Sequence, residues 1–339
     1  MRIRTMLTIA VAGIAVLSMG SGAVSGQSAS ATSKVHRTWT PPRTPDGQPD
    51  LQGIWTNDTA TPLERPAELA GKEFFTADEA AAYTKRVRDR FLAQSRDIVH
   101  YDDAVWQDET YKREAGRRTS LVTDPLDGKV PPLTPEAEKQ KAARADANGR
   151  SGSADSAARR TLAERCISWL NVGPPMLPPS YNANLQILQT RDHVVIFHEM
   201  IHDVRIIPLD GRPHIAQDIR QLAGDSRGHW EGDTLVVDTT NFSGKTNFKA
   251  ATRNNRQDLF ATEDLHVVER FTRVDSDAIR YEFTVEDPAT WTRRWSGEVP
   301  ITRFEGPILE YACHEGNYGL PNILRAARVL EKQKHEAAK

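Results

Sequence analysis

The chain contains little cysteine and no block of basic residues. Its 339 residues include two cysteines, and 44 Lys and Arg stand against 46 Asp and Glu, giving a formal net charge of −2. Binding to a nucleic-acid backbone depends on clustered positive charge, which is missing here. The sequence therefore argues against a nucleic-acid partner, and we expect a small-molecule ligand or substrate. It does not predict the oligomeric state.

No apolar run at the N-terminus is long enough for a permanent membrane span. Residues 6–17 are apolar but too few to cross a bilayer. Arg2 and Arg4 precede them, and small residues with an Ala-x-Ser pattern near Ser25 follow, which is typical of a secretory signal peptide. We predict cleavage of residues 1–26, a periplasmic or secreted protein, and no stable membrane anchor. An uncleaved tether is the alternative.

The two cysteines are Cys166 and Cys313. In an oxidising compartment a lone pair of cysteines is more often a disulfide than two free thiols. Export therefore predicts a Cys166–Cys313 bridge, with two buried thiols as the alternative.

In the N-terminal half of the mature chain the sequence predicts a linker, one strand and a helical region. Residues 27–48 are rich in Ser, Thr and Pro and form the predicted linker, and a short strand follows at 49–57. The capping box of Thr76 to Glu79 opens a predicted helix that continues to residue 94. Thr134 and Pro135 begin a second helix, and residues 158–170 predict a third.

From about residue 183 the pattern changes to strands at hairpin spacing. Without long intervening helices, such runs indicate an antiparallel meander. We predict an α+β, mainly β fold that is barrel-like and compatible with a lipocalin-like barrel, with an N-terminal helical embellishment. Residues 49–165 would pack on the barrel, 166–320 would form the antiparallel β domain, and 321–339 would form a C-terminal helix. The predicted strands are 184–190, 193–200, 203–209, 234–242, 265–274, 278–287, 291–304 and 308–313.

Residues 198–202, His-Glu-Met-Ile-His, match the H-E-x-x-H motif of zinc peptidases. That site needs a helix, so that both histidines reach one metal ion. The β-branched neighbours predict a strand instead, on which His198 and His202 would lie roughly 13 Å apart at about 3.3 Å per residue. We therefore expect no metal and no other cofactor, and keep a zinc metallopeptidase as an alternative.

Gly224 to Gly228 match the G-x-S-x-G motif of serine hydrolases. A nucleophile elbow has a strand before the serine and a helix after it, and the order here is reversed. We interpret Ser226 as a loop residue whose hydroxyl binds backbone or ligand.

Polar residues on the strands supply the remaining candidates. Alternation places Arg270 on one face of strand 265–274 and Asp287 on the apolar face of strand 278–287. If these faces share an interior, both groups are costly there unless they are paired or used in catalysis. A structural Arg–Asp ion pair is the alternative to a catalytic role.

Aromatic residues on neighbouring strands suggest a pocket wall. Tyr281 and Phe283 share a face, as do Trp291 and Trp295 on the next strand. Together they would suit an apolar or aromatic ligand. A plain core role is the alternative.

Histidines gather in the second half of the chain, and His is the usual acid or base near neutral pH. They are His198, His202, His214, His229, His266 and His314. If the protein is an enzyme, we expect His202 and His314 to act with Glu269 or Asp287, while Arg205 or Arg270 stabilises an anion. Ser226 and His214 would bind the ligand.

Four segments resemble signatures of a large family of exported bacterial proteins without an assigned activity. They are DGRPH (210–214), SRGHWEGDTLVVDTTNF (226–242), ERFTRVDSDAIRYEFTVEDPATWT (269–292) and YACHEGNY (311–318). The resemblance spans roughly residues 50 to 325. It implies one continuous family domain and adds no catalytic residues.

The sequence thus predicts metal-independent acid–base chemistry on a small apolar or aromatic molecule, by a lyase, isomerase or hydrolase. A non-catalytic, lipocalin-like binding protein is the alternative of a different class.

Overall fold

The computed structural model describes residues 39–95, 116–148, 154–169, 172–179, 181–244, 247–252 and 255–338. The predicted signal peptide and the linker up to residue 38 lie outside these residues.

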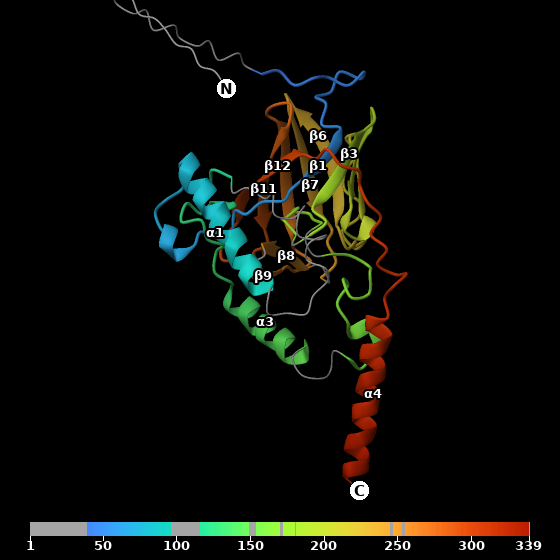
Figure 1. The fold of residues 1–339 in the computed structure, drawn as a ribbon. Helices are drawn as coiled ribbons and strands as arrows, with labels where there is room; N and C mark the ends of the chain where they lie inside the picture. Colours follow the sequence, from blue (N-terminus) through green and yellow to red (C-terminus); the bar gives the residue numbers. More distant parts are fainter. Residues whose placement is uncertain are drawn as a thin grey trace, which may run out of the picture. The chain divides into compact units, whose positions relative to one another are not determined.

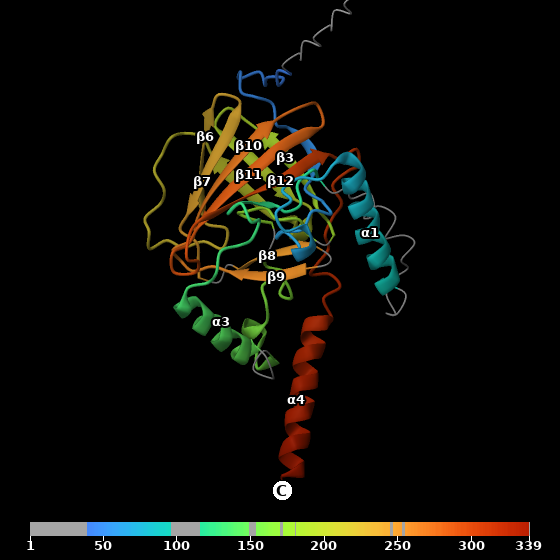
Figure 2. The ribbon, with the colours of Figure 1, turned by 90° about the vertical axis from the view of Figure 1, so that its left-hand side faces the viewer.

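Nine antiparallel strands curve into a nearly closed barrel (Figures 1 and 2). Their order is β5-β4-β3-β1-β12-β11-β10-β7-β6, and β2 (Val122–Asp124) pairs with β12. The first strand therefore lies between the last strand and the β3–β5 hairpins. No backbone ladder joins β5 to β6, so these two strands form the seam of the barrel. The bounds are β1 Gly53–Thr56, β3 Asn184–Gln189, β4 His193–His198, β5 Val204–Pro208, β6 Asp225–Glu231, β7 Thr234–Thr240, β10 His266–Arg273, β11 Ala278–Glu286 and β12 Trp295–Arg303.

The predicted fold class, mainly β with an antiparallel barrel and few helices, is confirmed. The helices α1 (Ala77–Ser95), α3 (Pro135–Asn148) and α4 (Gly319–Ala337) match three predicted helices. The capping box forms as expected, since the Glu79 backbone N–H donates to Thr76 Oγ1 and the Thr76 N–H donates to Glu79 Oε2.

Two predicted elements are wrong. The described residues 158–169 contain the end of one 3-10 turn (Ala157–Arg159) and further turns instead of a helix. Cys166 adopts a left-handed backbone with φ 54°, which a helix excludes. Residues 308–313 form no strand, because no neighbouring strand pairs with them.

Several strands in the structure were not predicted from the sequence. β2 and β6 carry polar residues or glycine, which hides their alternation. The hairpin of β8 (Asn247–Thr252) and β9 (Asn255–Phe260) is a separate two-stranded sheet.

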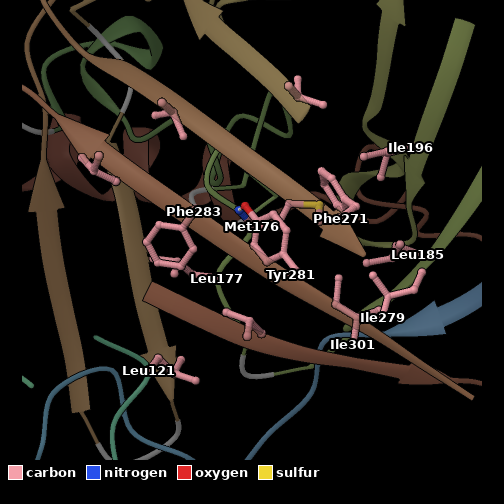
Figure 3. Packing of buried hydrophobic residues seen from close by; sticks show 14 of the residues in the cluster. Leu121, Met176, Leu177, Leu185, Ile196, Phe271, Ile279, Tyr281, Phe283 and Ile301 are labelled. Carbon is pink, nitrogen blue, oxygen red and sulfur yellow. Dashed lines mark hydrogen bonds between the residues drawn. The ribbon is translucent and has the colours of Figure 1, made fainter. Parts of the chain in front are cut away.

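The barrel is filled by side chains. Inward residues of β10 and β11 pack against Met176 and Leu177, which come from the segment 172–179 and are completely buried (Figure 3). Gly297 lets β12 approach this layer closely. A Cβ added there would lie 2.4 Å from Cζ of Phe283 and 3.1 Å from the carbonyl oxygen of Leu121.

The predicted disulfide is confirmed. Cys166 and Cys313 are bonded, with their Cα atoms 5.7 Å apart and a sequence separation of 147. Among the described residues, no helix has both the length and the apolar character needed to cross a membrane.

Candidate functional site

Inside the barrel an ion pair links the seam strand β5 to β10. Arg205 donates two hydrogen bonds to Glu269, at 3.0 and 2.6 Å, and the Tyr281 hydroxyl donates to the same carboxylate at 2.8 Å. Arg205 also donates to Ser226 Oγ on β6 at 3.3 Å, and Ser226 contacts Thr239 Oγ1 at 3.0 Å. The network therefore joins the two strands that share no backbone ladder.

Burial and the Arg205–Glu269 charge pair together set the electrostatics of this network. Arg205 is 5% and Glu269 0% exposed. Burial opposes the charge on Arg205, but the adjacent Glu269 carboxylate outweighs it and raises the pKa of Arg205. Burial, with the nearby Glu269 charge, raises the pKa of Tyr281 well above its ordinary value. The structure brings Arg205, Glu269 and Ser226 together but encloses them, which favours a structural role.

Ser226 is also not the loop residue that the sequence suggested. It lies on β6, faces the interior and is followed by more strand, so the backbone of a nucleophile elbow is missing.

The H-E-x-x-H residues lie at the end of a strand. β4 ends at His198, and the 3-10 turn Met200–His202 follows, with Ile201 (φ 59°) and His202 (φ 47°) in left-handed conformations. Burial, together with the Arg205 charge, lowers the pKa of His198 to about 3, so its ring is neutral. The two histidines thus share no helical face, and this backbone does not fit a zincin site. Within the described chain no three His, Cys, Asp or Glu side chains are grouped as metal ligands.

The remaining motif residues organise the turn. Buried Glu199 accepts hydrogen bonds from Asn182, Asn184 and the backbone N–H of Leu309. His202 is exposed, with Nδ1 3.2 Å from the carbonyl oxygen of Tyr311. His314, three residues after Tyr311, is also exposed, and no side-chain hydrogen bond in the described part joins it to His202. The predicted joint action of these histidines with Glu269 or Asp287 therefore has no geometric support.

Asp287 is a structural carboxylate. It accepts hydrogen bonds from the backbone N–H and hydroxyl of Thr262 and of Thr290, at 2.6–3.1 Å. These four bonds tie the end of β11 to two loops, so the predicted ion pair with Arg270 does not form.

The prediction for Arg270 was wrong by one residue. Glu269 points into the barrel, whereas Arg270 points outward and donates to Glu231 at 2.8 Å. Successive side chains of a strand alternate between faces. An error of one residue therefore means that the whole set predicted to point inward on β10 lies on the outer face.

The four aromatic residues of the predicted pocket wall are core residues. Tyr281, Phe283, Trp291 and Trp295 are at most 2% exposed. They pack on one another with ring centroids 5.6–5.9 Å apart. A ligand-facing wall would keep accessible surface, so the packing favours the core alternative.

A second polar assembly lies on the outer face of the barrel. Asp238 on β7 points outward, because its neighbours Val237 and Thr239 are buried in the interior. One Asp238 oxygen lies 2.7 Å from Nε2 of His266, and the other lies 2.8 Å from Nε2 of His214. We call Asp225, His214, Asp238 and His266 the Asp238 cluster.

The segment between β5 and β6 holds His214 in the cluster. Nδ1 of His214 lies 2.8 Å from Asp225, which also accepts from the backbone N–H of Ile215. The Asn241 side chain donates to three carbonyl groups of this segment. Contacts from both ring nitrogens, to Asp225 and to Asp238, fix the orientation of the His214 ring.

His266 is the accessible end of the cluster. Its hydrogen bond to Asp238 outweighs partial burial and raises the pKa of His266. The same bond lowers the pKa of Asp238, against the effect of burial. The side chain of His266 is 36% exposed, and its Nδ1 forms no hydrogen bond to any other described residue.

No protein-family model, curated protein or solved structure matched the chain. The choice between the Arg205–Glu269 network and the Asp238 cluster as the functional site therefore depends on their geometry alone. The sequence pointed to His214 and to a gathering of histidines that includes His266, but not to Asp225 or Asp238. The available signal was an aspartate at an outward position of an otherwise uncharged strand, Thr234–Thr240.

Proposed function

We propose that the protein is an exported enzyme that carries out metal-independent acid–base chemistry on a small molecule. His266 is the general acid–base, and Asp238 orients its ring and stabilises the imidazolium. The observation that carries the proposal is a partly exposed imidazole at 2.7 Å from a carboxylate, whose other ring nitrogen has no hydrogen bond among the described residues. A positioned base of this kind contributes about 10²–10⁴-fold to a rate.

The chemistry follows from the order of the groups. Nδ1 of His266 accepts a proton from a substrate C–H or from an attacking water, and the resulting positive charge is stabilised by Asp238. His214, held by Asp225, fixes the other oxygen of Asp238. No serine, threonine or cysteine hydroxyl or thiol forms a hydrogen bond with His266 among the described residues, which favours a base over a nucleophilic triad. The reaction class is then a lyase, an isomerase or a hydrolase that activates water.

Export is part of the proposal. It is supported by the N-terminal sequence pattern and by the disulfide, which is consistent with an extracellular location. The aromatic residues that suggested an apolar substrate belong to the core, so they no longer support that substrate class.

A substrate panel tests the proposal. We expect the purified protein to turn over at least one member of a panel of small esters, lactones and carbon acids, and the His266→Gln and Asp238→Asn variants to lose that activity. His229→Gln is the matched control, because His229 is also an outward histidine beside a carboxylate, Glu231, at 3.2 Å. A retained small molecule seen by native mass spectrometry, with no turnover across the panel, would instead support the lipocalin-like binding protein.

A further inference from the structure

The C-terminal helix α4 (Figure 1) has an apolar stripe that is not buried against any other described residue of its chain. None of its residues is buried, and it shares no extensive contact with another helix or strand of the described part. The stripe follows the helical repeat and consists of Leu320, Ile323, Leu324, Ala327 and Leu330. Most of the stability of a helix in a protein comes from packing of its apolar face, so burial of the stripe would stabilise α4.

A second apolar surface lies on the outer face of β3, β4 and β5. Leu188, Val204 and Ile206 are 44%, 48% and 61% exposed. The strand register places Leu188 beside Val195 and Val195 beside Ile206 in one row, and Phe197 beside Val204 in the next. These five residues, the β3–β5 patch, are contiguous across three strands. Contiguous exposed apolar surface of this kind marks interaction sites.

The two surfaces match in size and charge. Three adjacent strands span about 10 Å, which is about the diameter of one helix with its side chains. Residues 319–339 contain five basic and two acidic residues, a net charge of +3, while the whole chain carries −2, so the rest carries −5. A basic amphipathic helix and an acidic body with an open apolar patch attract each other.

We infer that the partner is a second copy of this chain, with α4 of each copy lying on the β3–β5 patch of the other. The exchange is reciprocal, so it gives a closed, two-fold symmetric dimer that contains the contact twice. A coiled coil of two α4 helices fits less well. Its seam would carry Lys334 one turn after Leu330, would extend over fewer than three heptads, and would bring two +3 helices together.

Sedimentation equilibrium of the purified protein at micromolar concentration tests the dimer. We expect a mass twice that of the chain, and a monomer for both Leu330→Glu and Ile206→Glu. Val329→Glu is the matched control, because Val329 is 54% exposed beside Leu330 at 57% but lies about half a turn from Leu320 around the helix. It should remain dimeric. Thermal melts of each variant establish that the fold persists, as expected for outward positions.

Covalent pairing decides which surfaces meet. A mixture of the Leu330→Cys and Ile206→Cys variants should form a one-to-one disulfide-linked heterodimer on mild oxidation, whereas Val329→Cys with Ile206→Cys should not. A monomeric wild-type protein would overturn the inference. So would a dimer that Leu330→Glu disrupts and Ile206→Glu leaves intact, which indicates a coiled coil, or binding of monomers to anionic lipid vesicles through α4.

Discussion

Replacing Glu269 with methionine would leave the Arg205 guanidinium buried without its counter-charge. Glu269 is fully buried and accepts three hydrogen bonds, two from Arg205 and one from Tyr281. Removing one member of a buried ion pair costs about 3–5 kcal/mol, since the remaining charge stays desolvated. The Tyr281 hydroxyl also loses its acceptor, which adds about 1–3 kcal/mol. We therefore expect Glu269→Met to lower the free energy of unfolding by roughly 4–8 kcal/mol, the sum of those two costs.

Urea denaturation with the disulfide intact measures this loss. The double variant Glu269→Met with Arg205→Met should recover much of it, because replacing both members of a buried pair with apolar groups is often neutral. Arg270→Met is the matched control on the adjacent residue of β10. Its outward pair with Glu231 is exposed, so we expect a change below about 1 kcal/mol. A Glu269→Met loss as small as that of Arg270→Met would refute a desolvated ion pair at the barrel seam.

Three further predictions concern the cluster, the core and the disulfide. The raised pKa of His266 stabilises the fold below about pH 6.5, and this stabilisation is lost as pH rises through the raised pKa. The lowered pKa of Asp238 stabilises the fold above about pH 4, and this stabilisation is lost as pH falls through the lowered pKa. The stability difference between wild type and Asp238→Asn, followed by urea melts across pH, should therefore peak between about pH 4 and pH 6.5; a flat difference would contradict the pairing. Gly297→Ala should cost about 1–3 kcal/mol in the same assay through overpacking, and Gly316→Ala, with open space around it, should cost nothing measurable; equal effects would show that the close approach at Gly297 is relaxed in solution. Cys313→Ser should lower stability by up to about 5 kcal/mol for a loop of 147 residues, and recovery of both cysteines alkylated from non-reduced wild-type protein would exclude the bridge.

The local pattern of the sequence was enough for the barrel and for three helices. Alternating Val, Ile and aromatic residues define strands such as His193–His198 and Ala278–Glu286, and the Thr76 and Thr134 caps define helix starts. Phase was harder. Glu269 and Arg270 are both charged, so nothing local shows which one turns inward, and the answer depends on Arg205 from a distant strand.

The candidate site depends on contacts between distant segments. His214, Asp238 and His266 come from a connecting segment and two strands, and only the paired register of β6, β7 and β10 places them together. The aromatic residues show the opposite difficulty. A ring that lines a pocket and a ring that fills a core follow the same strand alternation, so the sequence is compatible with either role for Trp295. Its packing against Phe283 and Trp291 favours the core role.

The pH dependence of turnover, for whichever panel substrate the wild-type protein accepts, tests the role of His266 most directly. We predict that the rate of proton abstraction rises with pH through the raised pKa of His266, that this rise moves to lower pH in Asp238→Asn, and that His266→Gln loses about 10²–10⁴-fold in rate while His229→Gln keeps the wild-type profile. A wild-type rate and pH profile retained in His266→Gln would contradict the account.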